Sequence, residues 1–180
     1  LTAGQILAVQ EIEADLGQPH RMLRLLQGDV GSGKTVVALF AMLIAVEAGA
    51  QATLMAPTEL LARQHFATLK KLLAESSVTV ALLTGRANKS ERETTLTRFA
   101  SGEVDIAVGT HALFQSGVEF SDLAVAVVDE QHRFGVHQRM TLAAKGKEVD
   151  VLVMTATPIP RTLMLTAYGD LQSSRLLEKP

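Results

Sequence analysis

One stretch of the sequence reads Gly28-Asp29-Val30-Gly31-Ser32-Gly33-Lys34-Thr35. It matches the pattern G-x-x-x-x-G-K-[ST], which forms a phosphate-binding loop when a strand precedes it and a helix follows it. Both neighbours have the required character, because a mostly apolar run at 22–26 comes before the loop and a long apolar segment at 36–46 follows it. The stretch therefore predicts a strand, a nucleotide-binding loop and a buried helix, in that order.

The residue types in this loop suit separate tasks. Glycine permits backbone angles that let consecutive N–H groups point into one concavity, and the helix that begins at Lys34 adds the positive end of its dipole. Lys34 supplies a charge for the β- and γ-phosphates of ATP, and the Thr35 hydroxyl can ligate Mg²⁺. The alternative is a glycine-rich turn that only caps a helix. The predicted ATP-binding residues of the loop are Gly28, Asp29, Val30, Gly31, Ser32, Gly33, Lys34 and Thr35.

A second candidate element of the site is an apolar run at 123–128 that ends in two carboxylates, Asp129 and Glu130. An acidic residue at such a strand end holds Mg²⁺ in proteins with a phosphate-binding loop, and we assign this role to Asp129. Glu130 then serves as the general base for the water that attacks the γ-phosphate. An exposed acidic turn is the alternative. His132, which follows the pair, could hydrogen-bond to the turn at 155–157 or lie in a surface turn.

Apolar runs alternate with helical patterns along the chain, which predicts an α/β fold. Strands are expected at 22–26, 52–56, 78–83, 104–108, 123–128 and 151–154, and helices at 6–16, 34–47, 58–75, from Ser90 to Gly102, and from about Pro160. Thr2 and Thr58 are the expected N-caps of two helices, a Ser90–Glu93 capping box opens another, and Leu60 and Leu72 are expected on an inner helix face. Continuous apolar strands indicate a mostly parallel central sheet with helices on both faces, a three-layer fold. Ligands of such sheets bind beyond the carboxyl ends of the strands.

The composition limits the possible functions. The chain has 180 residues, a formal net charge of −2, one Tyr, no Trp and no Cys. The absence of Cys excludes disulfides and thiolate metal sites. The five histidines lack metal-ligand spacing. Because the net charge is slightly negative, nucleic acid could be attracted only by a local group of residues. The longest apolar run, at 36–46, is too short to span a membrane, and no signal-peptide pattern opens the chain. These features predict one cytoplasmic domain.

Five motifs together resemble the first RecA-like motor domain of superfamily 2 helicases, and more narrowly that of RecG helicases. They are the loop at 28–35, Met-Ala-Pro-Thr-Glu-Leu-Leu-Ala-Arg-Gln-His at 55–65, Gly-Thr-His-Ala-Leu at 109–113, Asp-Glu-Gln-His-Arg-Phe-Gly-Val at 129–136, and Met-Thr-Ala-Thr-Pro-Ile-Pro-Arg-Thr-Leu at 154–163. The last two are similar to those of the transcription-repair coupling translocase, but Gln131 favours RecG. The resemblance covers essentially the whole chain.

The resemblance also implies roles for single residues. Gln5 matches the residue that reads the adenine base, although a solvent-facing position on the helix is the alternative. Gln131, His132, Thr155 and Thr157 match motifs that couple the nucleotide site to DNA. Contacts to the DNA backbone are implied for Thr58, Arg63, Thr84, Gly85 and Thr110.

The same resemblance implies an ATP-dependent DNA helicase with MgATP as cofactor, acting on branched DNA in repair and recombination. A second RecA-like domain and a DNA-reading wedge domain are expected partners in a larger parent chain, of which residues 1–180 form the ATP-binding domain. The isolated domain is then expected to be weakly active or inactive. A motor domain of the transcription-repair translocase and a nucleotide-binding module that does not hydrolyse ATP remain alternatives.

Overall fold

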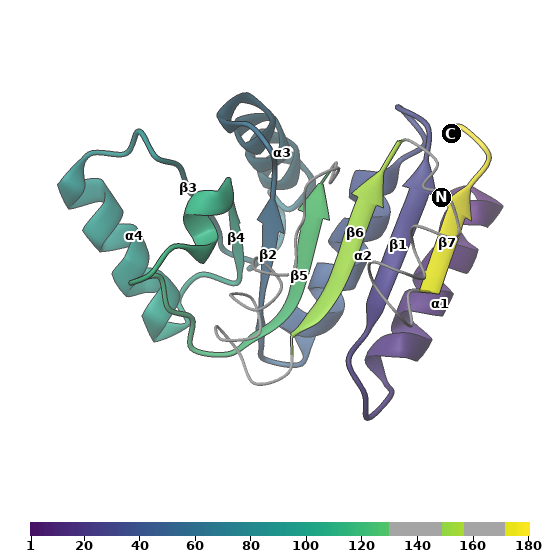
Figure 1. The fold of residues 1–180 in the computed structure, drawn as a ribbon, viewed down its shortest axis with the longest axis horizontal. Coiled ribbons are helices and arrows are strands. Elements are labelled where there is room, and N and C mark those ends of the chain that lie inside the picture. Colours follow the sequence, from purple (N-terminus) through teal and green to yellow (C-terminus); the bar gives the residue numbers. More distant parts are fainter. Residues whose placement is uncertain (130–148, 157–171) are drawn as a thin grey trace.

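A computed structural model describes residues 1–129, 149–156 and 172–180 and shows a seven-stranded sheet (Figure 1). The strands lie in the order β3-β4-β2-β5-β6-β1-β7, and all six pairings between neighbours are parallel. The parallel sheet expected from the apolar runs is confirmed. Its elements are α1 (Ala3–Leu16), β1 (Leu23–Gly28), α2 (Lys34–Glu47), β2 (Gln51–Met55), α3 (Glu59–Leu72), β3 (Val80–Leu83), α4 (Lys89–Ser101), β4 (Ile106–Gly109), η1 (His111–Phe114), β5 (Leu123–Asp129), β6 (Asp150–Thr155) and β7 (Gln172–Leu176).

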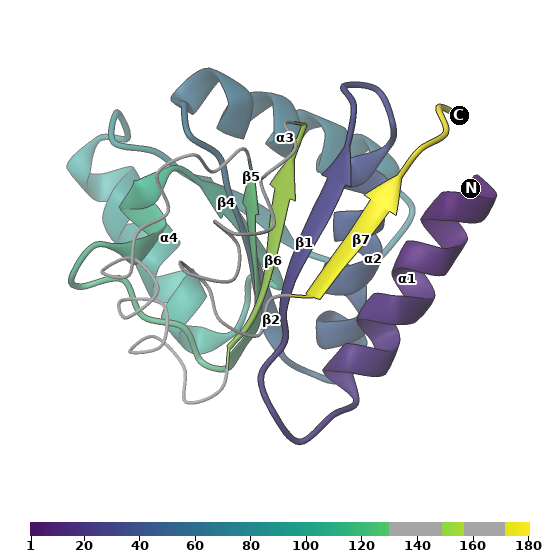
Figure 2. The same ribbon diagram turned by 45° about the vertical axis from the view of Figure 1, so that its right-hand side comes forward.

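Helices cover both faces of the sheet (Figure 2). One core cluster joins α1, α2 and α3 to the sheet, and a second joins α4 and η1 to the opposite face. Successive residues of β5 alternate between the clusters, with Val125 and Val127 in the first and Ala126 and Val128 in the second, because neighbouring side chains of a strand point to opposite faces. Among the described residues, no helix has the length and apolarity needed to cross a bilayer.

Side-chain caps fix where three helices begin. Thr2 and Thr58 cap α1 and α3, as predicted, by accepting hydrogen bonds from the backbone N–H groups of Gln5 and Leu61. The predicted Ser90 start of the fourth helix is wrong, because Asn88 caps α4 by accepting from the N–H of Glu91. Ser90 therefore already lies within the helix, where its carbonyl accepts a hydrogen bond from the Thr94 hydroxyl.

One other expectation from the pattern is wrong, and one strand was missed. Leu60 and Leu72 do not lie on the inner face of α3, because they are 67% and 51% exposed; Ala62 and Leu69 are the buried residues. The strand β7 was not predicted, because its sequence is polar and only Ser174 and Leu176 are buried. The helix expected from Pro160 lies outside the described residues.

Gly109, at the end of β4, has no room for a side chain. A Cβ atom there would overlap the backbone carbonyl oxygen of Leu83 on the paired strand and press on Leu113. We expect Gly109→Ala to lower the free energy of unfolding by about 1–3 kcal/mol, since overpacking of a fixed backbone costs this much. Chemical denaturation measures the loss. Gly85→Ala is the matched control, because open space surrounds that position; equal stability of the two variants would contradict the expectation.

Candidate nucleotide site and the adjacent strand ends

The loop between β1 and α2 has the backbone shape that the glycine pattern predicts. Gly31 and Gly33 both have φ near +84° (83° and 84°), a region that side chains strongly disfavour. The backbone N–H of Ser32 donates to the carbonyl of Asp29 at 3.0 Å, which closes the turn. A Cβ atom at Gly28 would overlap Ser32 Oγ, and one at Gly33 would overlap the Gln5 amide. A side chain at Gly28 or Gly33 would therefore displace Ser32 or Gln5, whereas Gly31 has open space around it and is favoured by its positive φ.

The first turn of α2 has no side-chain cap. Its N-cap residue is Gly33, whereas α1, α3 and α4 each begin with a side-chain oxygen on a backbone N–H. Uncapped N–H groups and the positive end of the helix dipole together form an anion-binding site. The buried hydroxyl of Ser32, in the same loop, also has no hydrogen-bond partner among the described residues. The N–H groups at the start of α2 and the Ser32 hydroxyl are thus hydrogen-bond donors that could bind an anion.

Lys34 lies over this loop with its ammonium group pointing back at the backbone. Its Nζ atom donates to the carbonyl oxygens of Gly28 at 2.6 Å and of Asp29 at 3.1 Å. Thr35 follows on the same first turn and is half-buried. Asp29, Val30 and Gly31 are exposed at the tip of the loop. The predicted phosphate-binding residues are therefore brought together.

Gln5 is buried, only 3% exposed, and joins α1 to the loop. Its Oε1 accepts from the backbone N–H of Thr2 at 2.8 Å, and its Nε2 donates to the carbonyl of Ser32 at 3.0 Å. The solvent-facing alternative for Gln5 is therefore wrong. An amide has two N–H donors and two acceptor lone pairs. These two bonds leave one N–H of Nε2 and one lone pair of Oε1 for other partners. The Thr-x-x-Gln spacing could have indicated the capping box between Thr2 and Gln5. It could not have indicated the contact to Ser32, which is 27 residues away.

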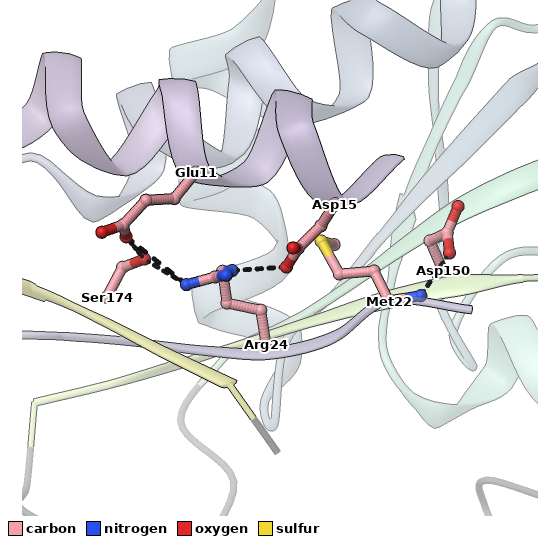
Figure 3. Close-up of polar contacts among 6 residues, drawn as sticks. All are labelled: Glu11, Asp15, Met22, Arg24, Asp150 and Ser174. Atoms are coloured by element: carbon pink, nitrogen blue, oxygen red, sulfur yellow. Dashed lines mark hydrogen bonds and ion pairs between the residues drawn. The ribbon is translucent and has the colours of Figure 1, made fainter. Parts of the chain in front are cut away.

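Arg24 attaches the other end of α1 to the sheet (Figure 3). The guanidinium group of this buried residue donates to Asp15 at 2.8 Å, to Ser174 at 2.9 Å and to Glu11 at 3.4 Å, and the Ser174 hydroxyl donates to Glu11. The network links α1 to β1 and β7. Near its start, α1 is attached to the loop by Gln5, and near its end it is attached to the sheet by Glu11 and Asp15. The network was not predicted, because Asp15 and Glu11 reach Arg24 only once α1 packs against β1, and Ser174 lies 150 residues away in the chain.

Asp129 lies at the same edge of the sheet as the loop. In the paired strands, Asp129 is opposite Met154 and Gln27 is opposite Thr155, so β5, β6 and β1 end at nearly the same level. Two strand spacings, about 10 Å, separate the strand ends of β5 and β1. Thr155 is buried between them. Glu130, Gln131, His132 and Thr157 lie outside the described residues.

His65 contacts Asp129 and was not predicted to do so. Its Nε2 atom lies 2.6 Å from Asp129 Oδ2, and both side chains are largely buried. A carboxylate only accepts hydrogen bonds, so His65 is the donor. The two residues are 64 positions apart, and nothing in the sequence indicated that they meet.

A pocket of about 230 Å³ adjoins the start of the loop. The ends of β1, β6 and β7 line it, with Gly28, Asp29, Ala156 and Arg175 among the lining residues. Arg175 was not predicted at the site, because it belongs to the strand that the sequence did not reveal.

The five residues expected to contact DNA follow the neighbouring strands β2, β3 and β4. Thr58, Arg63 and Gly85 are exposed, whereas Thr84 and Thr110 are buried. Thr110 caps η1 by accepting from the backbone N–H of Ala112. Glu59 pairs with Arg63 within the first turns of α3 at 3.0 Å, and with Arg86 at 3.4 Å. The pair with Arg86 connects the start of α3 to the segment that follows β3. These residues form a second group at the same edge of the sheet, separated from the nucleotide loop by the ends of β5 and β6.

Comparison with known proteins agrees with this arrangement. Residues 2–166 match the family described as DEAD/DEAH box helicase. The chain belongs to this family. The DEAD/DEAH box helicase chain is 52% identical over 99% of its length to the ATP-dependent DNA helicase RecG of Pasteurella multocida, and 54% identical over its full length to that of Streptococcus pneumoniae. It spans about a quarter (26%) of the length of each of these relatives.

A solved structure described as RecG bound to a three-way DNA junction has the same fold as this DEAD/DEAH box helicase domain. The TM-score is 0.85 at 44% sequence identity, and the match covers the whole of this chain and 24% of the RecG chain. The α/β architecture and the resemblance to the helicase motor domain of RecG are thereby confirmed.

Proposed function

We propose that this chain is the ATP-binding, first RecA-like motor domain of a larger DNA helicase. In the full-length protein it hydrolyses MgATP to drive translocation on branched DNA, and so remodels stalled replication forks. One observation carries the proposal: the uncapped start of α2, with Lys34 and Thr35, lies at the same sheet edge as Asp129. In this proposal, residues of the described ranges 1–129 and 149–156 would supply the donors for a triphosphate and a carboxylate for its metal ion.

The residues present fit ATP and Mg²⁺ by their chemistry. Backbone N–H groups of the loop, the Ser32 hydroxyl and Lys34 Nζ are donors for phosphate oxygens, and phosphate would replace the Gly28 and Asp29 carbonyls as the partner of Lys34. Within the described parts of the chain, no cluster of three His, Asp or Glu side chains could hold a metal alone. Mg²⁺ commonly takes one or two protein oxygens together with phosphates and water, and Thr35 and Asp129 would supply them.

In this proposal Mg²⁺ neutralises charge on the phosphates, and protein groups orient the reactants. Glu130 takes the proton from the attacking water, Lys34 stabilises charge on the γ-phosphate, and Gln5 uses its remaining donor and acceptor for the adenine edge. Thr155, between the ends of β5 and β1, belongs to the coupling segment with Gln131, His132 and Thr157.

The DNA-binding part of the proposal concerns Thr58, Arg63, Thr84, Gly85 and Thr110. Hydroxyls, backbone N–H groups and a cation suit contacts to phosphates that do not depend on base sequence. The formal charge of −2 makes such an interaction local to this group of loops. The RecG structure bound to a three-way DNA junction supports a branched substrate.

The test is ATP turnover by the full-length protein with and without DNA. We expect a three-way junction to stimulate turnover more than linear duplex of equal length, and Glu130→Gln to lower turnover by ~10²-fold or more while nucleotide still binds. Phosphate release and binding of a fluorescent ATP analogue measure these quantities. ATP binding without hydrolysis by the wild-type protein would instead support a nucleotide-binding module, and equal stimulation by both DNAs would contradict a branched substrate.

A further inference from the structure

The contact between His65 and Asp129 connects two parts of the site that the proposed function treats separately. His65 belongs to α3, which follows β2, whereas Asp129 ends β5, the neighbour of β2 in the sheet. The two side chains are 13% and 9% exposed, and their atoms Nε2 and Oδ2 lie 2.6 Å apart. The carboxylate expected to hold Mg²⁺ is therefore held by a helix that is remote in sequence.

The same turn of α3 also reaches the proposed DNA-binding surface. Arg63 precedes His65 by two residues, which places the two side chains about 200° apart around a helix of 3.6 residues per turn. The Arg63 side chain is accordingly 55% exposed and pairs with Glu59, while His65 points inward to Asp129. A displacement of this turn, when DNA phosphate is bound, would therefore move His65, whose Nε2 donates to Asp129.

We propose that His65 is a positioning residue that orients the Asp129 carboxylate for Mg²⁺ and links it to the DNA-facing turn of α3. This inference rests on the proposed function. Partners that hold a metal ligand from behind fix its orientation, and their loss commonly lowers metal affinity or activity by 10–100-fold. A merely structural pair would also satisfy two buried polar groups, so the test must separate the two roles.

The experiment measures binding of a fluorescent ADP analogue to the full-length protein, once with excess Mg²⁺ and once with EDTA. The ratio of the two dissociation constants is the gain in affinity due to Mg²⁺. We expect His65→Leu to reduce this gain by ~10-fold without changing affinity in EDTA, and Asp129→Asn to reduce it as well. His65→Gln should retain the gain, because its amide N–H can replace Nε2 as donor.

Phe66→Leu is the matched control. Phe66 is the next residue of α3 and packs against the core, but its partner is Lys70 rather than Asp129. This variant should keep the wild-type gain. Thermal unfolding of each variant verifies that the domain is folded.

Addition of a three-way junction to the same assay tests the link to DNA. If α3 connects the two sites, DNA changes the affinity for the magnesium–nucleotide complex by a coupling factor, which His65→Leu abolishes and Phe66→Leu preserves.

Three results would overturn the proposal: an unchanged Mg²⁺ gain in His65→Leu, an equal loss in His65→Gln, or a loss that is the same in EDTA. An unchanged DNA effect in His65→Leu would overturn the link to α3. If the wild-type protein bound no nucleotide, the proposed function itself would fail, which is a different outcome.

Discussion

Lys34→Ala in the full-length protein is expected to lower ATP turnover by ~10²–10³-fold, the usual cost of removing one charge-stabilising donor from an active site. Lys34 Nζ contacts only the carbonyl oxygens of Gly28 and Asp29 among the interactions of the described chain. A bound triphosphate would compete for this ammonium group. Steady-state phosphate release at saturating DNA measures the effect.

The fold should tolerate this change, because Lys34 is not among the buried residues of α2, which include Val37, Ala38, Ala41 and Met42. The unfolding midpoint of Lys34→Ala should therefore stay close to that of the wild type. Lys71→Ala is the matched control, since Lys71 is exposed in the last turn of α3. Turnover by Lys34→Ala at the level of Lys71→Ala would contradict the assignment of the loop as the catalytic ATP site.

The second large effect concerns residues 1–180 on their own. We expect this chain to hydrolyse ATP at least ~10³-fold more slowly than the full-length protein with DNA, because motor ATPases of this kind need an arginine finger from another element. The curated RecG relatives are about four times longer, since this chain spans 26% of their length. Single-turnover hydrolysis by the two forms, at equal concentrations and with the same three-way junction, measures the ratio.

Nucleotide binding by the isolated chain provides the control. The uncapped start of α2 and the Gln5 contact lie wholly within residues 1–129, so weak binding of a fluorescent ATP analogue should persist and should be lost in Lys34→Ala. DNA-stimulated turnover by the isolated chain at the rate of the full-length protein would show that no second element is needed.

The phosphate-binding loop and its helix were predictable because their signals are local. Gly33 at φ +84° opens α2, and the helix spans Lys34–Glu47 as the apolar run indicated. The continuous apolar strands likewise predicted a parallel sheet buried on both faces. Each of these inferences needs only the order of residues along a short segment.

The strand β7 and the buried face of α3 depend instead on contacts between segments that are distant in the sequence. The polar strand β7 becomes a strand only because β1 offers an unpaired edge and Arg24 and Glu11 bind its Ser174. Leu60 and Leu72 belong to an apolar pattern, yet the direction of α3 against the sheet leaves them exposed. Propensity and periodicity cannot give this direction, because it is set by contacts with other elements.

By itself, the amino-acid sequence determined the glycine-rich loop before α2, the alternation of strands and helices, and the presence of a carboxylate at the end of the fifth strand. Only the tertiary structure decided that Gln5 holds Ser32 and that His65 holds Asp129. The physical reason is that these hydrogen bonds join residues 27 and 64 positions apart, and such contacts form only when the sheet brings the ends of its strands together.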